Sequence, residues 1–235
     1  MSSEKTPRSR RAFVADLGRA ATAVALSTSL TPGVLTAAAA GSDVSHASPG
    51  DWDLSWIPRL ATATDKAIFD WPTLGDPADP ILLELADRYL DNCATAYGSQ
   101  RYEVRVVLNI RTQAVPAALT DELWAGFRLG AEYGVKDPNT SQPAELNPFL
   151  HRAPSPAPGI ELPTLADMLK RGAIVLVCDF ALTNLSKRLA GKVGATPDAV
   201  HSALRAGLVP GAFAVPSGIF GLARAQNAGC GLVRI

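Results

Sequence analysis

The sequence predicts an α/β fold, namely a single domain in which a parallel sheet carries helices on both faces. Two observations indicate this class. Apolar runs of strand length alternate with segments of helical periodicity, and the runs are apolar throughout instead of at every second residue. Strands of that kind belong in a parallel sheet that helices cover on both sides. Five such runs occur, so a sheet of about five strands is expected.

The first half of the domain contributes two strands and two helices. The first helix begins after Pro80 and stops at Gly98, and the second has Thr120 as its cap and Gly134 as its stop. These elements are expected over residues 66–70 (strand), 81–93 (helix), 103–110 (strand) and 121–133 (helix).

A proline-rich loop over residues 134–163 separates the two halves and holds seven of the eighteen prolines. Turn formers such as Asp137-Pro138 and Asn147-Pro148 lie within it. Long loops in compact domains are usually functional or lack fixed structure. Two interpretations stay open: a surface excursion, or a segment that lines a site or an interface.

The last third is more regular. Thr196 precedes Pro197 at a first helical turn, and Ser217 is placed to cap the last helix. The expected elements are 165–170 (helix), 173–178 (strand), 181–193 and 197–206 (helices), 212–215 (strand), 219–228 (helix) and 232–235 (strand).

The N-terminus carries Arg10 and Arg11 followed by Phe13, then an uncharged run from residue 20 to an A-x-A-like end at residue 40. This order resembles a bacterial twin-arginine (Tat) export signal. It implies a signal peptide over 1–40, a leader over 41–64, a domain over 65–235, and export to the periplasm or the outside through the Tat machinery. An ordinary secretory signal and a transit peptide are the alternatives. The run is only weakly apolar, so no stable membrane anchor is expected.

Composition narrows the class of protein. Without residues 1–40 the chain has 17 basic and 20 acidic residues, a formal net charge of −3, which does not favour a nucleic-acid partner. The three cysteines and three histidines match no metal-binding spacing, so the sequence predicts no metal site and no cofactor. The odd cysteine count leaves at least one thiol free or paired between chains, and a Cys93–Cys230 disulfide stays open. Trp52 and Trp56 are candidates to dock the leader on the domain.

Cys178 is the candidate nucleophile. It ends a buried strand, and ligands of open α/β sheets bind beyond the carboxyl ends of the strands. The helix that follows directs its N-terminus there, and free N–H groups favour a thiolate. Ser217 and Gly218 begin another helix expected on the same edge, where they offer donors to an anion. The alternative is that Cys178 is a small buried apolar residue.

From about Trp52 onward the chain resembles the DsrE/DsrF-like sulfur-relay superfamily, and most closely an exported branch. The segments that carry the resemblance are 51–56 (DWDLSW), 172–178 (GAIVLVC), 206–211 (AGLVPG), 215–220 (VPSGIF) and 224–230 (RAQNAGC). The resemblance implies a five-stranded parallel sheet and homo-oligomers, commonly trimers or hexamers. It also implies persulfide transfer on a cysteine in some members, and Cys178 matches that position.

Two functions follow from these observations. The favoured one is an exported module without enzymatic activity, which binds a small ligand or assembles as a homo-oligomer and in which Cys178 is inert. The alternative is a thiol or persulfide sulfur carrier that uses Cys178 and takes a small sulfur compound as its partner. Whether the chain is an enzyme stays open at this point.

Overall fold

The structure, a computed structural model, describes residues 13, 15, 16, 52–98, 103–154 and 161–234. Five parallel strands form one sheet in the order β4-β3-β2-β1-β5. The strands are β1 (Asp65–Trp71), β2 (Val104–Ile110), β3 (Ile174–Cys178), β4 (Ala212–Val215) and β5 (Gly231–Val233). The predicted single α/β domain with a five-stranded parallel sheet is therefore confirmed.

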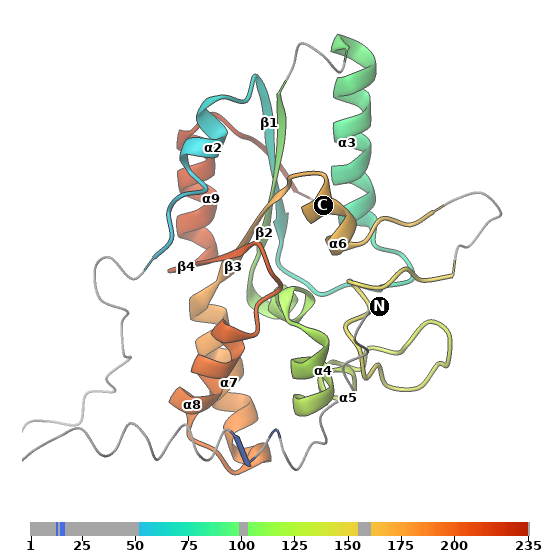
Figure 1. The fold of residues 1–235 in the computed structure, drawn as a ribbon, viewed down its shortest axis with the longest axis vertical. Coiled ribbons are helices and arrows are strands. Elements are labelled where there is room, and N and C mark those ends of the chain that lie inside the picture. The colour runs from blue at the N-terminus through green and yellow to red at the C-terminus, as the bar shows by residue number, and fades with distance from the viewer. Residues whose placement is uncertain (1–12, 14, 17–51, 99–102, 155–160, 235) are drawn as a thin grey trace, which may run out of the picture.

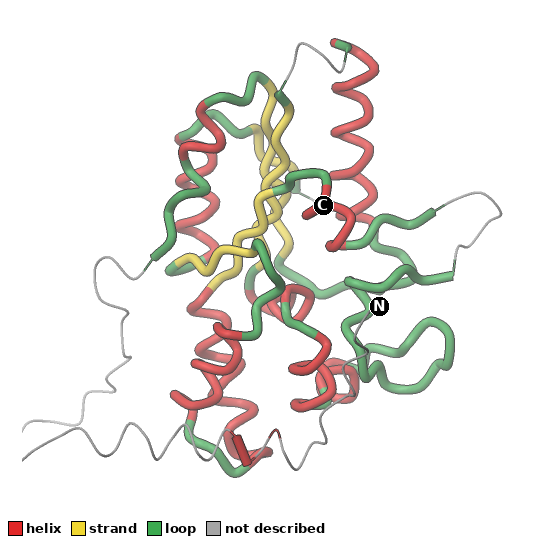
Figure 2. Tube along the Cα trace, in the orientation of Figure 1, coloured by secondary structure: helices red, strands yellow, loops and turns green. Residues whose placement is uncertain are grey.

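Helices cover the two faces of the sheet (Figures 1 and 2). Strands β1 to β4 step in one direction across the sheet, and right-handed crossovers place their connections on one face. The return from β4 to β5 runs the other way and places its helix on the opposite face. The helices are α2 (Pro58–Ala61), α3 (Ile81–Tyr97), α4 (Asp121–Phe127), α5 (Leu129–Tyr133), α6 (Leu165–Lys170), α7 (Asp179–Val193), α8 (Pro197–Ala206) and α9 (Gly218–Asn227).

Alternate residues of the strands enter two separate cores. In β1, Phe69 joins the large core under α3, whereas Ile68 joins a smaller core under α2 and α9. In β2, Leu108 and Val107 divide in the same way. The period of two along each strand thus assigns every side chain to one face. All four of these side chains are at most 2% exposed, as a sheet covered on both faces requires.

The expected leader over 41–64 contributes to the core where it is described. Trp56 and Leu60 are fully buried, and both pack in the core under α9. Trp52 lies beneath the guanidinium of Arg205, whose Cζ is 4.9 Å from the ring centroid. The expectation that tryptophans dock this segment on the domain agrees with these contacts. The short helix α2 was not predicted.

Most element boundaries differ from the prediction by one to a few residues, and three larger differences change the arrangement. The single helix expected over 121–133 is two helices, because Arg128 adopts a left-handed conformation with φ of 55°. A 3-10 helix, η1 (Thr112–Ala118), follows β2 and was not predicted. Helix α7 begins directly at Asp179, without a turn after β3. Consequently α7 and α8 extend beyond the carboxyl edge of the sheet (Figure 1).

Candidate functional site

The candidate site lies at the carboxyl edge of the sheet, and the predicted residues meet there. Cys178 pairs with Val215 in the β3–β4 register, two residues before Ser217. The backbone N–H of Phe180 donates to the carbonyl of Pro216 at 3.3 Å, which joins the starts of α7 and α9. Cys178, Ser217 and Gly218 are therefore on one edge, as expected. Arg10 and Arg11 of the predicted signal lie outside the described residues.

Cys178 itself is buried. It is only 5% exposed and packs in the large core. A reagent or a sulfur donor needs access to the Sγ atom, so the described conformation limits such chemistry. This burial agrees with the interpretation of Cys178 as an apolar residue at the end of a strand.

A buried ion pair that the sequence did not predict dominates the edge. The side chain of Asp70 is fully buried. Its Oδ1 accepts a hydrogen bond from Nε of Arg111, and its Oδ2 accepts one from Nη2 of the same arginine, both at 2.8 Å. Nδ2 of Asn109 donates to Oδ1 at 3.0 Å, and Nη2 of the exposed Arg234 is 3.8 Å from Oδ2. Both carboxylate oxygens of this β1 residue are thus engaged by groups from β2, from the residue that follows β2, and from the residue that follows β5. In the sequence, the one signal for this ion pair was a charged residue, Asp70, at the end of an apolar strand.

The electrostatics of this pair favour its charged form. Burial raises the pKa of Asp70, but the hydrogen bonds from Arg111 and Asn109 outweigh burial and the pKa is lowered overall. The hydrogen bond to Asp70 raises the pKa of Arg111, and Cys178 adds a smaller Coulombic contribution. That contribution agrees with the register: Ile110 pairs with Val177, so the next residues, Arg111 and Cys178, are neighbours. Because Asp70 already compensates Arg111, little positive charge remains for the sulfur.

The predicted ligand residues have structural contacts of their own. The Ser217 hydroxyl accepts a hydrogen bond from the N–H of Phe220 at 3.1 Å, which makes it the N-cap of α9. Gly218 lies against Arg111, since a Cβ atom there would be 2.6 Å from the Cβ of that arginine. The missing side chain lets the Arg111 stem pass under the start of α9. Both residues therefore support the ion pair and the helix that covers it.

A second charged cluster adjoins Cys178. Oδ1 of the buried Asp179 lies 3.0 Å from Nε2 of His201 and 3.4 Å from Nε of Arg205. Both partners come from α8, which packs antiparallel to α7 in the hairpin below the sheet (Figure 1). The cluster fixes α8 to the start of α7, and through Arg205 it also contacts Trp52.

A cavity of about 130 Å³ opens beside Asp70. Its walls come from the end of β1, the loop over 72–80, the first turn of α3 and one residue of the proline-rich loop. The lining residues are Asp70 to Asp76, Asp79 to Leu83 and Phe149. Most of the walls are apolar, whereas the exposed Asp76 and Asp79 stand on the loop that borders the cavity. A cavity of about 150 Å³ with apolar walls admits a molecule the size of benzene, so this one suits a small ligand.

The proline-rich loop packs against this side of the molecule. Asn147 is fully buried, and its Nδ2 donates to the carbonyls of Ala117 and Leu119 at 2.9 and 2.6 Å. Phe149 then reaches the cavity, and its ring lies 5.6 Å from that of Trp71. One residue of the loop, Phe149, therefore lines the cavity, whereas most residues over 139–146 are exposed.

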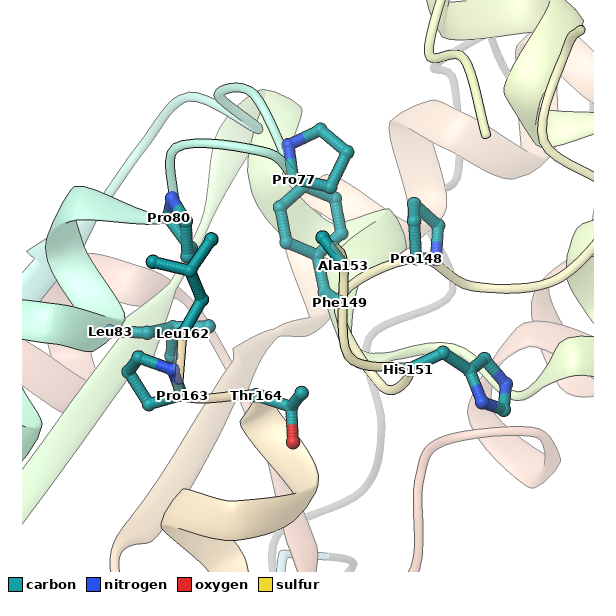
Figure 3. A pocket seen from close by; sticks show the side chains of 10 residues that line it. All are labelled: Pro77, Pro80, Leu83, Pro148, Phe149, His151, Ala153, Leu162, Pro163 and Thr164. Atoms are coloured by element: carbon teal, nitrogen blue, oxygen red, sulfur yellow. The ribbon is translucent and has the colours of Figure 1, made fainter. Parts of the chain in front are cut away.

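A neighbouring crevice between the same loop and α3 is much smaller (Figure 3). It shares Pro80, Leu83 and Phe149 with the cavity and is bordered by His151 and Thr164 on the far side. Its volume of about 10 Å³ holds no more than a water molecule, so it is not a ligand site.

Several other site types find no support in the described part of the chain. Within the described residues, no three His, Cys, Asp or Glu side chains gather as metal ligands do. None of the helices described is both long and apolar enough to cross a bilayer. Cys93, Cys178 and Cys230 are free thiols, so the structure contains no Cys93–Cys230 disulfide.

Comparison with known proteins adds little. No protein-family model and no curated protein matches the chain. Among solved structures, the chain is similar to a protein of unknown function, MTH1491 from Methanobacterium thermoautotrophicum, with 13% sequence identity. The match covers 73% of this chain and 99% of that one, with a TM-score of 0.34.

Proposed function

We propose that the chain is an exported, DsrE-like α/β module that binds a small ligand in the cavity beside Asp70, without covalent chemistry. The observation that carries the proposal is the cavity itself. It has the size of a small molecule, lies at the carboxyl edge where α/β sheets bind ligands, and has Asp70, the last residue but one of β1, among its lining residues.

The lining specifies the chemistry of the ligand. Trp71, Leu74, Leu82 and Phe149 offer an apolar interior, and each is nearly or fully buried. The carboxylates of Asp76 and Asp79 stand on the bordering loop, where they attract a positive charge or a hydrogen-bond donor. The ligand class that fits is a compact apolar body with an amine or another donor at one end. A ligand with a carboxylate in that position is repelled.

Binding of small probes tests the proposal. Benzylammonium, toluene and benzoate share a ring and differ in the charge of the substituent. Thermal unfolding of the full chain should shift upward most with benzylammonium and least with benzoate, at concentrations on the order of 1 mM or above for so few atoms. Equal shifts with all three probes, or none, would contradict the proposed ligand class.

A matched pair of variants locates the effect. Ile81 lines the cavity and is 47% exposed, so Ile81→Trp narrows the cavity without disturbing the core. Ile219 is 66% exposed on α9 and is not among the cavity residues, so Ile219→Trp is the control. Only Ile81→Trp should abolish the benzylammonium shift.

The alternative, sulfur transfer on Cys178, has one observation in its favour. The register places the cysteine next to Arg111, within reach of its positive charge. Mass spectrometry of the native protein after treatment with a persulfide donor separates the two functions. The binding module predicts no persulfide on Cys178 until the chain is unfolded, whereas a sulfur carrier acquires it in the native state.

A further inference from the structure

Helix α4 contains a glycine where a helix would favour almost any other residue. Gly126 is the sixth of seven residues, and glycine is among the poorest helix formers. It is also buried. A buried glycine inside a helix can make room for a close neighbour. A Cβ atom on Gly126 would lie 2.7 Å from both Cδ1 and Cε1 of Phe13, and 2.9 Å from its Cζ.

Phe13 fills the space above that glycine. Its ring meets the ring of Phe127 edge to face, with the centroids 4.9 Å apart and the planes at 88°. This is a favoured geometry for two aromatic rings. Phe127 is only 6% exposed and belongs to the large core, against which Phe13 packs as a partly buried residue. The glycine and the ring edge thus form a notch of matching shape, the Gly126–Phe127 notch.

We propose that the Gly126–Phe127 notch is a docking site for the chain's own Phe13, which holds the chain at that residue against the folded domain. The occupant is specified by two independent features, the missing side chain at Gly126 and the Phe127 ring that packs against Phe13. A larger residue at position 126 or a smaller one at position 13 removes one half of the fit.

Docking has a consequence for export, and that consequence rests on the proposed function. Phe13 follows the arginine pair of the predicted twin-arginine signal by two residues. A receptor that binds Phe13 together with the arginines must first take it from the notch. The folded domain and the receptor therefore compete for the same side chain, whereas the docking itself requires no export.

Limited trypsin digestion of the full chain tests the docking. The segment offers cleavage sites on both sides of Phe13, at Arg8, Arg10, Arg11 and Arg19. Phe13→Ala and Gly126→Ala should each raise the initial cleavage rate of this segment roughly 2- to 10-fold, the effect of losing one aromatic contact. The double variant should cleave no faster than either single variant, because both changes remove the same contact.

Gly191→Ala is the matched control. Gly191 also lies inside a helix, α7, but nothing stands within 4 Å of its Cβ position, so the cleavage rate should stay at the wild-type value. A wild-type rate in both Phe13→Ala and Gly126→Ala would overturn the proposal. Phe13→Ala leaves every residue of the domain unchanged, so a folding defect in Gly126→Ala does not obscure the result. An export assay on the same variants is separate: if neither the wild-type chain nor Gly126→Ala, in which Phe13 is released from the notch, is exported, the export signal is contradicted and the docking is left intact.

Discussion

Arg111 holds Asp70 of the neighbouring strand through two parallel hydrogen bonds of 2.8 Å, and the carboxylate is completely buried. Two residues that are 41 positions apart in sequence, one near the end of β1 and one just after β2, are thereby joined at the edge where the cavity opens. Such a pair of hydrogen bonds fixes the relative orientation of the two side chains as well as the distance between them. The pair positions the end of β1, and with it the wall of the cavity.

Replacement of Asp70 by Asn should strongly destabilise the fold. The amide of the variant carries no negative charge and has only one acceptor oxygen for the two Arg111 donors. The Arg111 guanidinium, whose side chain is 22% exposed, therefore loses its countercharge. Loss of one partner of a buried pair costs about 3–5 kcal/mol, and we expect the lower end of this range. Urea unfolding should show a lower midpoint at an unchanged slope.

The same substitution at Asp91 is the control for that experiment. Asp91 pairs with Arg171 at 2.6 Å, but its side chain is 64% exposed. An exposed pair contributes about 0–1 kcal/mol. Comparable losses of unfolding free energy in Asp70→Asn and Asp91→Asn would show that burial does not make the Asp70 pair more stabilising than an exposed pair.

The Asp70 pair should also make stability depend on pH. The pKa of Asp70 is lowered in the folded state, so the folded chain binds fewer protons than the unfolded one. The stabilisation is therefore complete above the unfolded value of about 3.9 and is lost as pH falls through the lower folded value. The difference in unfolding free energy between wild type and Asp70→Asn should be constant from about pH 5 to about pH 7. It should shrink below about pH 4, and a difference that persists there would contradict this account.

Gly130→Ala should displace the part of the proline-rich loop that contains Ala144. A Cβ atom at position 130 would lie 2.2 Å from the carbonyl oxygen of Ala144 and 2.4 Å from its nitrogen, so the backbone itself must move. Overpacking of this kind costs about 1–3 kcal/mol. Because Phe149 lies on the same loop, benzylammonium binding should weaken as well. At Gly191 nothing lies within 4 Å of the Cβ position, so Gly191→Ala should instead raise the free energy of unfolding by up to about 1 kcal/mol through helix propensity.

Ser217 should behave as a helix cap and not as a ligand residue. Ser217→Ala removes the acceptor for the N–H of Phe220 and should cost about 1 kcal/mol. Ser217→Asp should restore most of that stability, since aspartate caps helices as well as serine does. Neither change should alter the affinity for benzylammonium. A loss of binding in both variants would assign Ser217 to the ligand site.

Replacement of both Arg10 and Arg11 by lysine tests the route of export. The positive charge is kept and only the guanidinium pair is lost. If the segment is a twin-arginine signal, the variant should accumulate inside a bacterial host while the wild-type chain reaches the periplasm. Cell fractionation with immunodetection measures this. Unchanged export of the lysine variant would indicate an ordinary secretory signal.

The sequence predicted the fold well because each strand is a continuous apolar run. Strand β3 is buried at all five positions, and such a run admits few other placements. The break at Arg128 was not predictable, since nothing in the local pattern requires a left-handed residue there. The position of β5 beside β1 was equally hidden, because the order of strands depends on contacts between distant segments.

The candidate site was only partly predictable for the same reason. Cys178, Ser217 and Gly218 meet because the carboxyl ends of parallel strands share one edge, which is a rule of topology. The pairing of Asp70 with Arg111 depends on β1 lying next to β2 in a specific register. Local sequence does not contain that register, so the principal polar contact of the site emerged only from the structure.

The central claim, a small ligand in the cavity beside Asp70, is tested most directly by nuclear Overhauser effects between bound benzylammonium and the protein. We predict contacts from the ring protons of the probe to the side chains of Trp71 and Leu82, which line the cavity. These contacts should disappear in Ile81→Trp and persist in Ile219→Trp. Contacts to residues outside the cavity, or contacts that survive in Ile81→Trp, would contradict the account.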